Sequence, residues 1–325
     1  MSMLRTIIVL IFVGVVVFAA YSMNRASDTS VTGRTDIFNG GTLTTNMQKH
    51  SIPLDQVLEG GPGKDGIPAL TDPAFTDVAR ADSVITDDVD GILVSADDAV
   101  KFYPYNIMVW HEVVNDTVGG KPLVITFCPL CGSAIVYEAE VDGRRETFGV
   151  SGKLYNSNLL MYDKTTESLW SQIEGEAVVG DKTGTKLALY PSQVVSFKTL
   201  REKYPQARVL GIDTGYRRDY SLSPYGDYNN SKDLYFPISI TDTRLPGKEI
   251  MYVVNFNDHS IAFKVADLKP GVVARVDVAG TSVSAALKDG VIETMPALPG
   301  YHTMWFAWSV YHQKDGIVWT AEKQR

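Results

Sequence analysis

The only two cysteines of the chain stand two residues apart, in the stretch TFCPLCGSAIVY. At this spacing, Cys128 and Cys131 can close a disulfide with little backbone movement or supply two thiolates to one metal ion. The residues after Cys131 are typical of a strand, so the pair lacks the helix N-terminus that lowers the pKa of a thioredoxin-type cysteine. A structural zinc site needs more ligands, and the chain has neither a second C-x-x-C nor an H-x₃₋₅-H pair. Three interpretations stay open: a redox-active pair, metal ligands assisted by histidine or methionine, and a structural disulfide.

Polar residues that suit thiol chemistry precede the cysteines in WHEVVND. Apolar spacing in YPYNIMVWHEVVND predicts one or two helical turns, which would place His111 and Asn115 on one face with Glu112 beside them. His111 is the candidate base, metal ligand or activator of a nearby thiol. The structural alternative is a histidine packed against the core, with an Asn-Asp turn closing the element.

A second polar group follows the cysteines, in GVSGKLYNSNLLMYD and SLWSQ. Amide, hydroxyl and indole groups that face one cavity suit a small polar ligand, although asparagine and serine here could equally satisfy a turn. The candidate substrate-binding residues of both groups are Glu112, Asn115, Tyr155, Asn156, Ser157, Asn158, Trp170 and Gln172.

Composition excludes several classes of function. The chain has 325 residues, a formal net charge of −8 and no lysine- or arginine-rich run, whereas nucleic-acid binding requires a concentrated basic face. It has neither a phosphate-binding glycine loop with lysine nor a G-x-S-x-G motif. Nucleic-acid binding and nucleotide-dependent chemistry are therefore not expected.

The N-terminus predicts export. Arg5 precedes an uncharged, largely apolar run from Thr6 to Met23, which is close to the length of a membrane-spanning helix. We expect residues 1–23 to be a membrane anchor or a cleaved signal, and the remainder to face the periplasm or cell exterior. Outside the cytoplasm a close dithiol can become and remain oxidised.

The rest of the chain predicts a mainly β protein, α+β with few short helices. Residues 24–49 are polar and without periodicity, and we interpret them as a flexible tether. Residues 50–215 predict a β-rich core with several hairpins, one of which turns at Asp142-Gly143. Residues 216–325 predict a tyrosine-rich connecting loop or lid, then a smaller β-rich half. GILVSADDAVKFYP and YVVNFNDHSIAFKV share a strand–turn–strand layout, so the two halves could be degenerate copies.

Three segments strongly resemble the bacterial and archaeal DUF3179 family, a domain of unknown function: DGIPAL, the run from WHEVVND to IEGEAVVG, and YPSQVVSFKTLREKYPQARVL. The resemblance is dense from Pro53 to Leu210 and looser in SPYGDYNNSKDLYFPI and FAWSVYH. Some members of the family are described as selenoproteins. If selenocysteine replaces a cysteine of this motif there, the resemblance implies redox chemistry at Cys128 or Cys131.

The leading hypothesis is a thiol–disulfide oxidoreductase of the cell envelope. One cysteine would attack a protein thiol partner or a small polar substrate, the other would resolve the mixed disulfide, and His111 would assist. The alternative is copper or zinc bound by Cys128, Cys131, His111 and Met161. A third possibility is a non-catalytic ligand-binding or scaffold module in which the disulfide fixes a loop.

Overall fold

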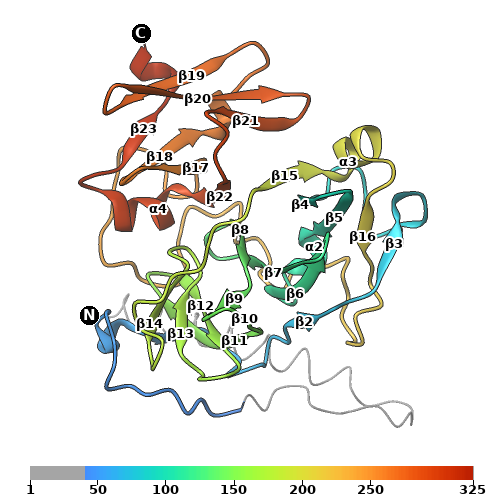
Figure 1. The fold of residues 1–325 in the computed structure, drawn as a ribbon, viewed down its shortest axis with the longest axis vertical. Coiled ribbons are helices and arrows are strands. Elements are labelled where there is room, and N and C mark those ends of the chain that lie inside the picture. Colours follow the sequence, from blue (N-terminus) through green and yellow to red (C-terminus); the bar gives the residue numbers. More distant parts are fainter. Residues whose placement is uncertain (1–40, 325) are drawn as a thin grey trace, which may run out of the picture. The chain divides into compact units, whose positions relative to one another are not determined.

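The computed structural model describes residues 41–324 (Figure 1). The predicted anchor, residues 1–23, and the tether as far as residue 40 lie outside the described residues. Within residues 41–324, no helix combines the length and apolar character needed to cross a membrane. The three α-helices described there are short: α2 (Tyr105–Met108), α3 (Phe197–Lys203) and α4 (Trp305–His312). The prediction of a mainly β protein with few short helices is confirmed.

The largest sheet has eight strands and is buried on both faces of its central hairpins. Its order is β2 (Leu70–Thr71), β6 (Val113–Val118), β7 (Lys121–Cys128), β8 (Ser133–Glu138), β22 (Gly300–Met304), β17 (Ile250–Phe256), β18 (His259–Lys264) and β23 (Ile317–Trp319). Because side chains alternate along a strand, Val124 and Leu123 of β7 enter two different cores. Cys128 lies on the Val124 side and shares its core.

A second sheet packs on that side and completes the core around the cysteines. It has five strands: β1 (Leu58–Glu59), β11 (Phe148–Tyr155), β12 (Asn158–Asp163), β13 (Leu169–Ser171) and β14 (Glu176–Val179). The turn between β11 and β12 consists of Asn156 and Ser157, both with positive φ (51° and 60°). This is the backbone of a tight type I′ hairpin, and it places Asn158 at the start of β12. A short hairpin of β9 (Glu140–Val141) and β10 (Arg144–Arg145) turns at Asp142-Gly143, as predicted.

A third sheet covers the opposite face of β6–β8. Its order is β15 (Ser192–Ser196), β4 (Asp90–Ala96), β5 (Ala99–Pro104), β16 (Arg208–Leu210) and β3 (Phe75–Asp77). β15, β4 and β5 form an antiparallel set, whereas β16 pairs with β5 in parallel, after α3. The C-terminal part repeats this arrangement: β22–β17–β18 are antiparallel, and β23 pairs with β18 in parallel after α4. Two units of the same strand order and pairing sense therefore occur in the described chain.

Each unit has an insertion at the same place, between its second and third strands. In the first unit the insertion carries β6–β14 and both cysteines. In the second it carries a three-stranded sheet of β19 (Val273–Val278), β20 (Thr281–Lys288) and β21 (Val291–Met295), which shares a small core with β17 and β18. The predicted boundary at residues 215/216 stays a prediction, and the eight-stranded sheet combines strands from both sides of it.

The helical prediction for the segment up to Asp116 is wrong in its second half. α2 forms a single turn, and Glu112 then adopts a left-handed conformation (φ 58°) that ends the helical path. The β-branched residues Val113 and Val114 enter β6 and pair with β7. Asn115 therefore lies on a strand, and His111 and Asn115 do not share a helical face.

Candidate functional site

The two cysteines occupy the loop between β7 and β8. Cys128 ends β7, Ser133 begins β8, and the two residues pair across the hairpin. The backbone N–H of Cys131 donates to the carbonyl of Cys128 (3.3 Å), and Gly132 has a left-handed φ of 56°. A turn of this kind holds its end residues within about 7 Å, which is the range that a disulfide can bridge. Both cysteines are free thiols, and no helix follows Cys131, as expected from the sequence.

The sulfur of Cys131 lies in a buried polar cage. Its Sγ is 2.9 Å from the Ser133 hydroxyl and accepts a hydrogen bond from the Asn158 amide at 3.1 Å. Gln172 supports both residues: its Oε1 accepts from Ser133 (2.6 Å) and from Asn158 (2.8 Å). Gln172 Nε2 donates to the Thr126 hydroxyl (2.8 Å). Every polar atom of the Gln172 and Asn158 side chains is thus paired, since Asn158 Oδ1 also accepts from the backbone N–H of Ile173.

The cage has enough donors to hold a thiolate. Asn158 Nδ2 carries two protons, so it can donate to Cys131 and to Gln172 at the same time. The Ser133 hydroxyl has one proton, which it can donate either to the sulfur of Cys131 or to Oε1 of Gln172. When Cys131 is a thiol, its S–H can donate to Ser133. When Cys131 is a thiolate, the hydroxyl can turn toward the sulfur, and Asn158 remains in place in both states.

Burial and hydrogen bonding shift the pKa values of the two thiols in opposite directions. Burial opposes ionisation of Cys131, but donors from Cys128, Ser133 and Asn158 outweigh it and lower the pKa of the Cys131 thiol. Burial raises the pKa of Cys128 well above its ordinary value, and its hydrogen bond to Cys131 adds to the effect. The donors around its sulfur therefore favour ionisation of Cys131 over that of Cys128.

A buried carboxyl group lies in the field of the same thiols. Burial raises the pKa of Glu112 from 4.5 to about 7, while the hydroxyl of Tyr225 opposes this rise by donating to Glu112 Oε1 at 2.8 Å. The charge of Cys131 raises the Glu112 pKa further. Glu112 can consequently exchange a proton near neutral pH beside the dithiol.

Residues 211–249, which we call the strap, cover the loop of the cysteines. They connect β16 to β17 and contain no helix or strand. Tyr225 reaches Glu112, and the Tyr228 hydroxyl donates to the carbonyl of Leu130, between the two cysteines (2.7 Å). Cys128 and Cys131 are 1% and 0% exposed beneath this cover. Most of the tyrosine-rich segment that the sequence predicts as a connecting loop or lid lies within the strap.

The second topological unit braces the site from its other edge. The backbone N–H of Met304, at the end of β22, donates to the carbonyl of Cys131 at 2.8 Å. Thr303 Oγ1 approaches the same carbonyl at 3.4 Å. A side chain at Gly132 would lie 3.3 Å from the Met304 side chain. The C-terminal part thus fixes the turn that carries Cys131.

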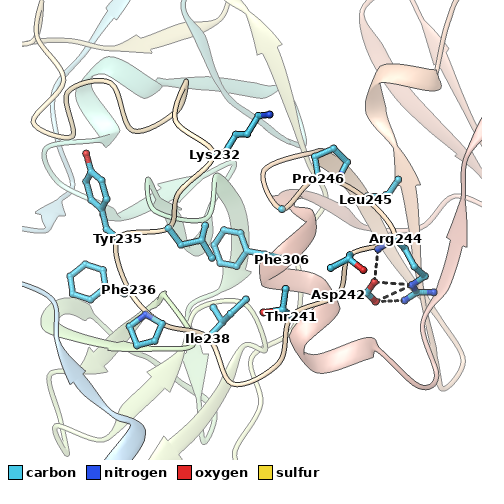
Figure 2. Close-up of a pocket in the computed structure, with 14 residues that line it drawn as sticks. Lys232, Tyr235, Phe236, Ile238, Thr241, Asp242, Arg244, Leu245, Pro246 and Phe306 are labelled. Atoms are coloured by element: carbon cyan, nitrogen blue, oxygen red, sulfur yellow. Dashed lines mark hydrogen bonds and ion pairs between the residues drawn. The ribbon is translucent and has the colours of Figure 1, made fainter. Parts of the chain in front are cut away.

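A separate cavity with a volume of about 750 Å³ is drawn in Figure 2. The strap forms most of it, and Phe306 of α4 projects into it. Four of its apolar residues also pack against the core that contains the cysteines: Leu234, Phe236, Ile238 and Leu245. An ion pair of Asp242 with Arg244 (2.7 Å) stands at its edge. The cavity therefore borders the large core to which both cysteines belong.

The structure gathers only part of the residues that the sequence indicated. Asn158 and Gln172 contact each other and form the cage with Cys131, and Glu112 lies close enough to interact with its charge. Met161 is buried in the same hydrophobic core as the cysteines. The described contacts of His111 are elsewhere: its ring nitrogens pair with the Pro68 carbonyl (2.8 Å) and with the hydroxyl of Tyr220 (2.7 Å). Burial lowers the pKa of His111 to about 4, so this side chain is neutral at pH 7.

Three of the remaining candidates, Asn115, Asn156 and Trp170, have hydrogen-bond partners outside the cage. Asn115 ties β6 to the backbone of Phe148, and the indole N–H of Trp170 donates to Asp163 (2.9 Å). Asn156 accepts a hydrogen bond from the backbone of the strap at Ser239 (2.8 Å). Ser157 is buried with no hydrogen-bond partner for its hydroxyl among residues 41–324, and Tyr155 packs against the small core beneath β12–β14.

Sequence reasoning missed Thr126, Ser133, Tyr225 and Tyr228 as site residues. The strand pattern could have indicated two of them as site residues. Thr126 lies on the same face of β7 as Cys128, and Ser133 is the cross-strand partner of Cys128. For the metal-binding alternative, no group of three or more His, Cys, Asp or Glu side chains able to hold a metal ion occurs within the described range.

The fold and the site define a mainly β protein with a buried, hydrogen-bonded dithiol. The chain belongs to the family described as "Protein of unknown function (DUF3179)", which it matches over residues 64–295. The resemblance seen in the sequence is thereby confirmed. No curated protein and no solved structure matches the chain.

Proposed function

We propose that this protein is a thiol-based redox protein whose site is the Cys128–Cys131 dithiol. The observation that carries the proposal is the cage: Asn158 and Ser133 hold the sulfur of Cys131, and the thiol of Cys128 donates to it from the adjoining turn. A cysteine that served only as packing would gain nothing from buried donors, because an apolar residue fills core volume without needing partners. Perturbed ionisation at a cluster of this kind is typical of functional sites.

Cys131 is the attacking sulfur in this proposal, and Cys128 is the resolving one. Oxidation joins the two sulfurs, releases two protons and transfers two electrons to the oxidant. Glu112, with a pKa of about 7, is the group that accepts and returns a proton at the dithiol. The sequence favours His111 for this role, and the hydrogen bonds of His111 to Pro68 and Tyr220 favour Glu112 instead.

A redox titration tests the proposal. Purified full-length protein is brought to equilibrium in mixtures of reduced and oxidised dithiothreitol, starting both from the dithiol form and from protein oxidised while denatured. Free thiols are then counted by alkylation and mass spectrometry. We expect one reversible two-electron transition, which Cys128→Ser or Cys131→Ser each abolishes. Two thiols that stay free at every ratio in folded protein, from either starting point, would refute it.

We further propose that residues 1–23 attach the protein to a membrane or export it, so that the dithiol faces the periplasm or cell exterior. The basic head and apolar run of these residues support this proposal. Cell fractionation, combined with labelling by a membrane-impermeant biotin reagent that modifies lysines, tests it. Recovery of the full-length chain in the cytoplasmic fraction, protected from the reagent, would contradict it.

We also propose that the two topological units arose from one duplicated unit. Their equal strand order, parallel final strand and equivalent insertion sites support a common origin. In this interpretation the first insertion carries the chemistry, and the second unit acts as its support through Met304. Alignment of β4–β5–β15–α3–β16 with β17–β18–β22–α4–β23 across many family members should score above shuffled sequences, and equal scores would count against duplication.

A further inference from the structure

We infer that the oxidant of the Cys128–Cys131 dithiol is a hydroperoxide rather than a disulfide. The inference rests on the proposed redox function and identifies the class of its substrate. It follows from the access to the sulfurs, from the donors around Cys131 and from the order in which the two cysteines must react.

Access to the sulfurs favours a very small oxidant. Both sulfurs are buried, and Tyr225 and Tyr228 of the strap are hydrogen-bonded over the cysteine loop. Attack on a disulfide requires the thiolate to approach along the S–S bond, with the substituents of both sulfurs accommodated. A protein or glutathione disulfide would have to displace the strap and break both tyrosine hydrogen bonds. The O–O unit of hydrogen peroxide is close to the size of two water molecules, so it needs a much smaller opening in this cover than a disulfide does.

The cage supplies the groups that cleavage of an O–O bond needs. The thiolate of Cys131 is the nucleophile, and Asn158 and Ser133 donate to it. As the sulfur gives up its negative charge to the peroxide, these donors can turn from the sulfur to the peroxide oxygen. The departing hydroxide or alkoxide needs a proton, and the carboxyl group of Glu112, held by Tyr225, is the buried acid of the site. A disulfide would gain less from these donors, because its leaving group is a sulfur that departs as a stabilised thiolate.

The reaction balances with the residues present. The thiolate of Cys131 attacks one oxygen, the O–O bond breaks, and Cys131 becomes a sulfenic acid while the other oxygen leaves with a proton from Glu112 as water or an alcohol. The sulfur of Cys128 then attacks the sulfur of Cys131 and loses its proton. The S–OH bond breaks, and the hydroxyl group takes up a proton and leaves as water. Overall, two thiols lose two electrons and become one disulfide, while the peroxide gains two electrons.

Apolar residues that line the cavity of Figure 2 pack against the core that contains the cysteines. The experiment therefore compares hydrogen peroxide with an organic hydroperoxide. Hydrogen peroxide requires no binding cavity, whereas an organic hydroperoxide could place its apolar part there. The common chemistry is the O–O bond.

The experiment compares the same thiols in folded and unfolded chains. Reduced full-length protein, folded or dissolved in urea, is mixed with hydrogen peroxide, cumene hydroperoxide or oxidised glutathione at equal concentration, and free thiols are counted by alkylation at increasing times. We expect the folded protein to lose both thiols to a hydroperoxide about a hundredfold faster than the unfolded chain. Oxidised glutathione should react more slowly with the folded protein than with the unfolded chain.

Variants identify the attacking sulfur. Cys128→Ser should stop at a Cys131 sulfenic acid, which dimedone traps, and Cys131→Ser should lose the fast reaction altogether. Ser133→Ala removes a single cage oxygen and is a milder second variant if a cysteine variant fails to fold. It should slow the peroxide reaction about tenfold, and slow the reaction with oxidised glutathione less, because only the peroxide oxygen also accepts a hydrogen bond from the cage.

The outcomes separate the inference from the proposed function. A reversible dithiothreitol transition, together with folded thiols that react more slowly with both hydroperoxides than unfolded ones, would overturn the hydroperoxide inference alone. Faster reaction with oxidised glutathione than with peroxide would also overturn it. If no disulfide forms in the dithiothreitol titration, both fail.

Discussion

Asn158→Leu provides the sharpest test of the cage. The substitution keeps a similar volume but removes the amide that donates to Cys131 (3.1 Å) and to Gln172 (2.8 Å). A hydrogen bond to a charged acceptor contributes about 1.5–3 kcal/mol, and about 1.4 kcal/mol corresponds to a tenfold change in an equilibrium. At a pH below the pKa of Cys131 in either protein, we therefore expect the thiolate fraction to fall about ten- to a hundredfold.

The measurement is a pH titration of the thiolate by its ultraviolet absorbance, with Cys131→Ser subtracted as the background. Asn115→Leu is the matched control, because Asn115 is also a buried amide that ties the same core together, through Phe148. Each leucine variant leaves buried backbone groups unpaired and should cost about 1–3 kcal/mol of unfolding free energy. Only Asn158→Leu should shift the thiolate titration to higher pH. If both variants shift it equally, or if neither does, the amide does not stabilise the thiolate.

Three further predictions concern stability and pH. Because the pKa of Glu112 is raised from 4.5 to about 7, the folded state binds more protons than the unfolded state between these two pH values, and the free energy of unfolding falls as pH rises through them. In urea unfolding, Glu112→Gln should flatten this decline and raise the free energy of unfolding at pH 8 by up to about 3 kcal/mol. An unchanged pH profile would argue against a buried ionising carboxyl. Burial lowers the pKa of His302 to about 4, so the unfolded state binds more protons than the folded state between pH 4 and 6.5, and stability is lost as pH falls through that range. His302→Phe should therefore move the midpoint of acid unfolding to lower pH. The control is His50→Phe, because His50 is exposed. Ser157→Gly should stabilise the protein by about 1 kcal/mol, because glycine suits the left-handed second residue of the turn after Asn156. The change also removes a buried hydroxyl that has no partner within residues 41–324, and a lower midpoint in thermal unfolding would contradict the prediction.

Local patterns were sufficient to predict the strand that follows the dithiol. The residues after Cys131 form β8, and the Asp142-Gly143 turn lies where the sequence signal placed it. The helix expected through Asn115 was wrong because Val113 and Val114 gain more from pairing with β7 than from continuing a helix that α2 begins. Periodicity over a few residues cannot weigh a helical turn against a place in a buried sheet.

The sequence predicted some residues of the site, but it did not predict which of them contact one another. Asn158 and Gln172 were candidates because of residue type, and so was His111, which pairs instead with Pro68 and Tyr220. Nothing in the local sequence distinguishes these cases. The contacts of Cys131 with Asn158 and of Ser133 with Gln172 span 27 and 39 residues of chain, so the packing of the two sheets decides them.

By itself, the sequence determined that two thiols stand at disulfide spacing at the end of a buried strand, and that Thr126 shares the face of Cys128. Both follow from covalent order and from the two-residue period of a strand. Only the tertiary structure decided which thiol has hydrogen-bond donors around its sulfur. Burial raises the pKa of a thiol, and it is opposed at Cys131 because β8, β12 and the segment after β13 bring Ser133, Asn158 and Gln172 together there, so that hydrogen bonds lower its pKa.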